Sequence, residues 1–496
     1  MTDSDQMINE IFDSFNTLNY LLVIIVFIIF GYRPPWWTRK AVDWVQKEIQ
    51  DLPGPLSLPL LGTRWVFSCG GYTFNKIHEF YADMYEKYGP IVKEEALFNI
   101  PVVSVFEKED IEKVLKSSGK YPIRPPTEAV AAYRKSRPDR YTSAGIVNEQ
   151  GAVWYHLRTS LTSDLTSPKT ISGFLPQVEE IAEDWCSFVR QHRANGDRVF
   201  DLEDVVGKLG LETSCALVLG RRLGFLIPGE ESDLGSKLAA AVHKNFIAIR
   251  DTYFGLPFWK FVQTSAYKNL AESEEMIYKL ALELIQTADE ATHDSAVFQS
   301  VLKADIDHKE KTAAIVDFIA AGIYTLKNSL VFLLYLIAMH PSTQEKILED
   351  SSKSYLKACV LESFRLLPTA YCLARVTEED LELSGYKVSA GSAVICHTGI
   401  ACKNDKYFRD AGEFRPERWL GEEKSATTSN ATFLVSPFGV GRRICPGKRF
   451  IEHVLPIILE STVRNFEIET VEPMELQFEF LLSPKGPTTM LFKDRG

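Results

Sequence analysis

A glycine-rich loop around one cysteine constrains the fold of this chain more than any other segment. It reads Phe438-Gly-Val-Gly-Arg-Arg-Ile-Cys-Pro-Gly-Lys-Arg-Phe450. Three glycines in the loop permit positive φ angles and a close approach of the backbone to a flat ligand, namely Gly439, Gly441 and Gly447. The loop therefore predicts a buried turn that packs against a planar cofactor.

The cysteine in this loop, Cys445, has surroundings that favour a thiolate. Pro446 suits the first turn of a helix, so the helix predicted over Phe450–Asn465 is expected to begin beside Cys445. Its amides and dipole would lower the thiol pKa. The other seven cysteines form no CxxC pair. Their spacing suits neither a disulfide framework nor a zinc site and indicates reduced thiols.

The complete spacing F-x-x-G-x-R-x-C-x-G resembles the cytochrome P-450 family. The resemblance implies that Cys445 is the axial thiolate ligand of haem b, with Phe438 and Gly439 in the same cofactor-binding loop. It also implies a monooxygenase that uses O2 and electrons from a redox partner. In that family the thiolate promotes O–O cleavage.

Four further residues are expected at the haem propionates. Arg443 lies two residues before the cysteine and could make charge-assisted hydrogen bonds to a carboxylate. Trp154 and Arg158 share one face of a predicted helix. The resemblance implies that both approach the propionates, and that Arg375 does so as well.

An acid and a base, Glu362 and Arg365, share one face of another predicted helix. Alone, such a pair is usually a surface feature. Within the resemblance, Arg418 of the segment Phe414-Arg-Pro-Glu-Arg-Trp419 joins them in a structural network near the cysteine.

A long predicted helix contains the sequence Ala321-Gly-Ile-Tyr-Thr325. Gly322 leaves room where dioxygen would bind, and the Thr325 hydroxyl can bond to the Ala321 carbonyl, which opens a polar notch. The resemblance makes Thr325 part of proton delivery. The family usually has Asp or Glu where this chain has Tyr324, whose reference pKa is about 10. We therefore expect proton transfer through water and Thr325 with less help from an acid.

Hydrophobic periodicity predicts one mainly helical domain with a minor β component, the cytochrome P-450 fold, behind an N-terminal membrane anchor. The expected helices are Val178–His192, Tyr278–Ala288, Lys311–Met339, Tyr355–Leu367 and Phe450–Asn465. The expected strands are Ile91–Lys93, Pro101–Phe106, Tyr386–Val388 and Ala393–His397.

The predicted divisions are an acidic tail (1–17), an anchor (18–32), a basic and proline-rich hinge (33–60) and the monooxygenase domain (61–496). The apolar run is shorter than the roughly 20 residues of a full span, so an interfacial helix, a signal segment or a core helix are alternatives. Acidic residues precede the run and basic residues follow it. This favours an endoplasmic reticulum anchor with a cytosolic catalytic domain. A mitochondrial membrane is the alternative, although a transit peptide should be poor in acids.

Several segments resemble the ecdysteroid hydroxylases of the mitochondrial-type clan, including Lys120–Glu128, Tyr133–Tyr141, Leu219–Leu226 and Leu366–Arg375. The resemblance implies hydroxylation of ecdysone to 20-hydroxyecdysone. Alternatives are a xenobiotic or fatty-acid hydroxylase on the same fold, and a non-catalytic haem-thiolate sensor or hormone-binding protein.

The expected partners are an ecdysteroid or similar lipophilic molecule, O2, a membrane and an electron donor. The resemblance to the mitochondrial-type clan implies an acidic adrenodoxin-type ferredoxin, because Lys357 matches a basic position used in that clan, and Lys448 and Arg449 could add to that patch. The N-terminal anchor favours NADPH–cytochrome reductase instead. The net charge of −11 argues against a nucleic-acid partner.

Overall fold

The computed structural model describes residues 47–496, apart from 60, 68–70, 97–98, 164, 195, 228–232, 287–295 and 351. The predicted acidic tail, the anchor at 18–32 and most of the predicted hinge lie outside the described residues.

Helices make up most of the described chain, and α12 is the longest of those described. They are α2 (Ile77–Tyr88), α3 (Lys108–Lys116), α4 (Glu128–Lys135), α5 (Gly145–Asn148), α6 (Gly151–Thr162), α7 (Pro168–His192), α8 (Leu202–Leu219), α9 (Asp233–Phe254), α10 (Ser265–Gln286), α11 (Ala296–Lys303), α12 (His308–Ala338), α13 (Pro341–Glu349), α14 (Lys353–Leu366), α15 (Thr398–Ala401), α16 (Lys424–Ala431) and α17 (Lys448–Asn465).

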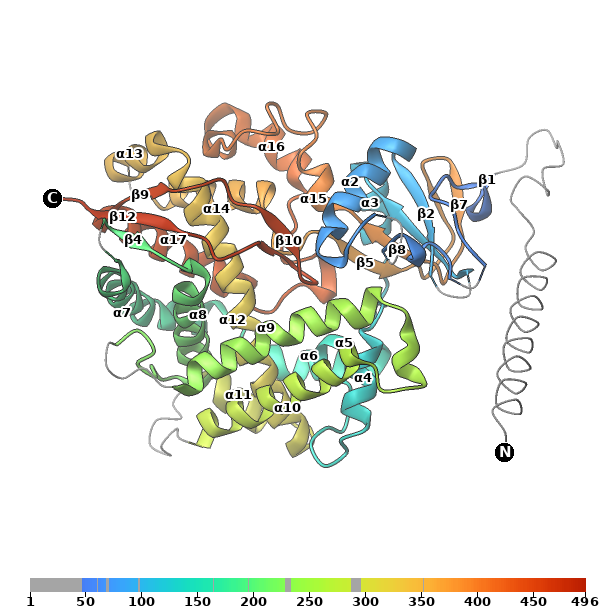
Figure 1. The fold of residues 1–496 in the computed structure, drawn as a ribbon, viewed down its shortest axis with the longest axis horizontal. Coiled ribbons are helices and arrows are strands. Elements are labelled where there is room, and N and C mark those ends of the chain that lie inside the picture. Colours follow the sequence, from blue (N-terminus) through green and yellow to red (C-terminus); the bar gives the residue numbers. More distant parts are fainter. Residues whose placement is uncertain are drawn as a thin grey trace, which may run out of the picture.

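Short strands form small sheets, of which the one with β4, β9 and β12 lies at one end of the molecule, those with β2, β5 and β8 and with β1 and β7 lie at the other, and β10 lies between the ends (Figure 1). One sheet has the order β2–β3–β8–β5, and the others are β4–β12–β9, β1–β7–β6 and β10–β11. The strands are β1 (Lys47–Glu48), β2 (Ile91–Glu95), β3 (Pro101–Val105), β4 (Arg198–Val199), β5 (Leu373–Val376), β6 (Leu381–Leu383), β7 (Tyr386–Val388), β8 (Ala393–Cys396), β9 (Phe466–Thr470), β10 (Leu476–Phe478), β11 (Leu482–Pro484) and β12 (Met490–Asp494).

The core is an apolar cluster to which α7, α8, α12, α14 and α17 contribute side chains. Most residues of α12 are buried, and its N-terminus is capped by Asp307, whose carboxylate accepts a hydrogen bond of 2.8 Å from the amide of Lys309. Among the described residues α12 is the one helix long and apolar enough to cross a membrane, but 67% of its most apolar window is buried in the core.

The predicted mainly helical fold with minor β structure is confirmed, and each predicted helix and strand lies within or overlaps an observed one. Two helices begin well before their predicted starts. The helix α7 begins at Pro168, where a proline suits the first turn, and α10 begins at Ser265.

The proline-rich segment assigned to the hinge packs against the domain where it is described. Leu52 lies in an apolar cluster, and the carbonyl of Pro53 accepts a hydrogen bond of 2.7 Å from the amide of Lys93. A Cβ on Gly54 would lie 2.0 Å from the Lys93 carbonyl oxygen, so this contact requires glycine.

Candidate functional site

The loop before α17 is a tight turn that presents the Cys445 side chain. The amide of Cys445 donates a hydrogen bond of 2.8 Å to the carbonyl of Phe438. Gly439 and Gly441 have φ angles of 72° and 69°, as their roles in a turn require. Gly447 differs from the prediction, because it has a helical φ of −74° and forms the N-cap of α17. The helix starts at Lys448, so Pro446 lies just before it.

The thiol of Cys445 is accessible but surrounded by protein. Burial raises its pKa, while the amides of Gly447 and Lys448 and the guanidinium groups of Arg158 and Arg124 act in the opposite direction. The amides at the start of α17 therefore lower the pKa of Cys445, as predicted, but they lower it by less than burial raises it. A thiolate here would be stabilised mainly by bonding to a cation such as iron.

Four arginines gather around this loop: Arg124, Arg158, Arg375 and Arg443. Burial lowers the pKa of each guanidinium group, and repulsion from the other three lowers the pKa of Arg443 further. Within the described residues, no ion pair joins any of the four to a carboxylate.

Two of these guanidinium groups have buried donors without a hydrogen-bond partner, Nε of Arg375 and Nη1 of Arg443. Unpaired buried donors and unneutralised cations are both costly. The cluster therefore fits a group with more than one carboxylate, as haem has in its propionates, close to the cysteine that would bind its iron.

The predicted pair on α6 lies directly against the cysteine loop. Trp154 is buried, and the Cζ atom of Arg443 lies 3.8 Å from its ring centroid. Arg158 donates a hydrogen bond of 2.6 Å to the carbonyl of Ile444, and Arg375 donates one of 3.2 Å to the carbonyl of Val440. The residues expected at the propionates thus converge on one loop.

Sequence reasoning missed Arg124 as a member of this cluster. It precedes two prolines in a segment without helical or strand periodicity, and it donates a hydrogen bond of 3.0 Å to the carbonyl of Val147. The only available signal was a lone basic residue in an otherwise apolar stretch.

The middle of α12 has accessible surface. Ala321 is exposed, and Ala320, Gly322 and Thr325 are partly exposed, whereas Ile323, Tyr324 and Leu326 are buried. The Thr325 hydroxyl donates a hydrogen bond of 2.7 Å to the Ala321 carbonyl, as predicted.

Gly322 has a packing role that was not predicted. A Cβ at this position would lie 2.1 Å from the Oγ atom of Ser214 on α8. Gly322 therefore allows α8 to approach α12 closely, whereas the prediction assigned it to the space for dioxygen. Sequence alone does not show which side of the helix faces a neighbouring helix.

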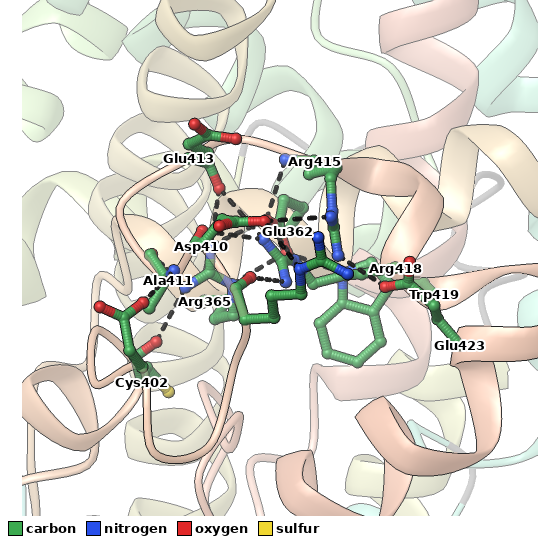
Figure 2. Close-up of polar contacts among 12 residues, drawn as sticks. Glu362, Arg365, Cys402, Asp410, Ala411, Glu413, Arg415, Arg418, Trp419 and Glu423 are labelled. Atoms are coloured by element: carbon green, nitrogen blue, oxygen red, sulfur yellow. Dashed lines mark hydrogen bonds and ion pairs between the residues drawn. The ribbon is translucent and has the colours of Figure 1, made fainter.

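The carboxylate of Glu362 is the centre of a buried polar network (Figure 2). Arg365 donates to both of its oxygens at 2.9 and 2.8 Å, and Arg418 donates to one of them at 2.9 Å. Trp419 Nε1 and the backbone amide of Arg415 also donate hydrogen bonds to the Glu362 carboxylate, at 2.9 and 3.0 Å. These two donors were not predicted.

Arg365 also ties the network to the loop that precedes the cysteine segment. Its guanidinium donates to the carbonyls of Cys402, Ala411 and Glu413 at 2.8, 2.7 and 2.9 Å. The network thereby fixes α14 against the chain between residues 402 and 419 (Figure 2).

Comparisons with known proteins agree with this geometry. The sequence profile described as Cytochrome P450 matches residues 52–492. Ecdysone 20-monooxygenase of Drosophila melanogaster is 43% identical over 484 residues, which cover 91% of this chain and 89% of the relative.

Two further relatives are more distant. "Cytochrome P450 302a1, mitochondrial" of Drosophila melanogaster is 29% identical, covering 85% of this chain and 90% of the relative. "Probable cytochrome P450 CYP44" of Caenorhabditis elegans is 30% identical, covering 92% and 96%.

Proposed function

Because the chain belongs to the cytochrome P450 family, and is therefore a haem-dependent monooxygenase, we propose that it hydroxylates ecdysone to 20-hydroxyecdysone. The observation that carries this proposal is the 43% identity to ecdysone 20-monooxygenase over nearly the whole chain, against 30% or less for the two other relatives above. A xenobiotic or fatty-acid hydroxylase remains the competing function.

In this proposal Cys445 supplies the thiolate that binds the haem iron. Phe438 and Gly439 would shape the loop that faces the haem, and Arg124, Arg158, Arg375, Arg443 and Trp154 would hold its propionates. When bound, haem supplies the redox centre at which dioxygen is reduced and one oxygen atom enters the substrate.

The remaining predicted residues act around that centre. Ala321 and Thr325 supply the polar notch in α12, and Gly322 maintains the packing of α12 on α8. Glu362, Arg365 and Arg418 hold the protein on the cysteine side.

We propose an adrenodoxin-type ferredoxin as the electron donor. Supporting observations are the mitochondrial name of one relative and the exposed position of Lys357 on α14. Lys448 would contribute less to binding an acidic ferredoxin, because its Nζ lies 3.7 Å from the carboxylate of Glu452 in an ion pair. The alternative is NADPH–cytochrome reductase at the endoplasmic reticulum, which the predicted anchor favours.

Reconstitution of the purified protein tests both proposals. Each redox system is supplied with NADPH, and ecdysone and lauric acid are incubated in parallel. We expect 20-hydroxyecdysone with the ferredoxin system and no oxidation of lauric acid. Oxidation of lauric acid but not of ecdysone would contradict the proposed substrate. Turnover with NADPH–cytochrome reductase but not with the ferredoxin would contradict the proposed electron donor.

A second measurement tests the iron ligand. Cys445→Ala should lose the thiolate signature in the reduced, carbon-monoxide-bound absorption spectrum, whereas Cys402→Ala should keep it. Cys402 is a matched control because it is a buried free thiol outside the loop.

A further inference from the structure

Tyr324, which stands where an acid was expected, is hydrogen-bonded to a carboxylate from a distant part of the chain. Its ring is buried on α12 and stacks on Phe246 with a centroid separation of 4.4 Å. Its hydroxyl donates to Oε2 of Glu479, which lies between β10 and β11. Burial and the negative charge of Glu479 raise the pKa of Tyr324, so the phenol stays neutral.

Glu479 is an ionised carboxylate although it is buried. Oε1 and Oε2 lie 3.1 and 3.0 Å from His243 Nε2, and Oε2 accepts a bond of 3.1 Å from the hydroxyl of Ser483. Burial acts to raise the pKa of Glu479, but the hydrogen bonds from His243, Tyr324 and Ser483 hold it below its usual value. The acid missing from the α12 sequence is therefore supplied in space by the C-terminal segment.

The outer side of this cluster reaches solvent. Glu479 lines a cleft of about 760 Å³ between α9 and the segment around Gln477, with Arg250 and Asp251 also in its wall. His243 is 43% exposed and lines a smaller hollow of about 230 Å³ that shares Asp251 with the cleft. Protons can therefore reach Glu479 from water directly or through the imidazole.

One turn beyond Tyr324 on α12 lies Asn328, whose Nδ2 donates a hydrogen bond of 3.3 Å to the carbonyl of Leu482. Asn328 follows Tyr324 by four residues and Thr325 by three, so its side chain neighbours both on the helix surface, although Tyr324 and Thr325 do not face each other. Asn328 is fully buried, and its Oδ1 has no hydrogen-bond partner. A buried acceptor without a partner is a position at which water or a hydroxyl donor binds favourably.

We propose that Glu479, Tyr324 and Asn328 form a proton relay that carries protons from the cleft to Thr325. A proton from cleft water or His243 binds Glu479, which then donates to the Tyr324 oxygen. Tyr324 passes its own hydroxyl proton inward to a water held by Asn328 and Thr325. The phenol is neutral before and after each transfer.

The stoichiometry is that of the monooxygenase reaction, in which the substrate, O2, two electrons from the redox partner and two protons give the hydroxylated product and water. The relay supplies protons only. The proposal rests on the monooxygenase activity and holds whichever substrate is hydroxylated. Lys327 is the other charged group beside the phenol, with its Nζ 4.6 Å from the Tyr324 ring centroid, and it is not part of the transfer path.

The test compares Glu479→Gln and Tyr324→Phe with matched variants of another tyrosine–glutamate pair. Tyr407 is buried and its hydroxyl donates to Glu107, so Glu107→Gln and Tyr407→Phe make the same chemical changes outside the site. The enzyme is reconstituted with whichever donor and substrate give turnover. Product and hydrogen peroxide are measured per NADPH consumed.

We expect product per NADPH to fall about tenfold in both relay variants, with a matching rise in hydrogen peroxide, and to stay within twofold in the matched pair. Glu479→Asp should recover part of the loss. Unchanged product per NADPH in Glu479→Gln would overturn the relay.

Two measurements without turnover separate the relay from a structural or substrate-binding role. Equilibrium dialysis should give the same substrate Kd for Glu479→Gln and the wild type; a raised Kd with normal coupling at saturating substrate would make Glu479 a substrate-binding residue and overturn the relay. The infrared difference spectrum between wild type and Glu479→Gln at pH 7 should contain a carboxylate band. A protonated carboxyl band instead would contradict the ionised state on which the relay depends.

Discussion

Replacing Glu362 by glutamine is expected to lower the free energy of unfolding by about 3–5 kcal/mol, because it leaves two buried guanidinium groups without an anion. Glu362 and Arg365 have side chains that are 0% exposed, and Arg418 is 2% exposed. One Glu362 oxygen accepts from Arg365, Arg418 and the Arg415 amide, and the other accepts from Arg365 and Trp419.

A glutamine side chain cannot satisfy this set of donors in either orientation. The less costly orientation turns its amide NH2 toward Arg365 Nε and Trp419 Nε1, which loses one charged and one neutral hydrogen bond. Those losses amount to roughly 2–4.5 kcal/mol before the unneutralised charge is counted. The expected loss is a large share of the free energy of unfolding, which is typically about 5–15 kcal/mol for a folded domain.

The assay is urea unfolding of the haem-loaded protein at pH 7, followed by far-ultraviolet circular dichroism. Glu423→Gln is the matched control, because Glu423 pairs with Arg415 in the same region but is 53% exposed, and it should cost less than about 1 kcal/mol. If the two variants lose the same stability, burial of the Glu362 network does not make it more stabilising than the exposed pair.

Three further perturbations follow from the described contacts. His397 is fully buried and its pKa is lowered to about 3 by desolvation, so the unfolded chain binds a proton near pH 6.5 that the folded chain does not. Stability should therefore fall as pH drops from 6.5 toward 3, by about 2 kcal/mol between pH 7 and 5, and His397→Gln should remove that part of the loss in urea unfolding. Gly322→Ala should cost about 1–3 kcal/mol through collision with Ser214, and Ser214→Gly should restore stability in the double variant; no restoration would contradict the packing role. Arg124→Leu should speed haem transfer to apomyoglobin by about tenfold or more, since a charged hydrogen bond contributes roughly 1.5–3 kcal/mol, and an unchanged rate would remove Arg124 from the propionate site.

Local patterns in the sequence predicted much of the fold and the cysteine-loop candidates. Helices such as α14 and α17 follow from hydrophobic periodicity, which depends on residues close in the chain. The loop around Cys445 was predictable because its glycines, arginine and cysteine occur within one short segment.

The missed residues are those that tertiary structure brings to the site. Glu479 lies 155 positions beyond Tyr324, and no local pattern pairs them. Trp419 was seen only as the end of a motif, although its indole bonds to Glu362. The close approach of Ser214 to Gly322 was not predicted, because helical spacing gives the faces of α12 but does not identify the helix that packs on each face.

The parallel pairing of β3 with β8 has a consequence for biosynthesis. Val102 pairs with Ala393, so one edge of β3 has no partner until almost 300 more residues have been translated. At roughly 5–20 residues per second, a ribosome needs about 15–60 s for that length. During this interval the nascent chain exposes an unpaired apolar strand edge, which is a site of aggregation. We therefore expect this chain to depend on chaperones during translation, and chains that terminate before β8 to be degraded or to aggregate.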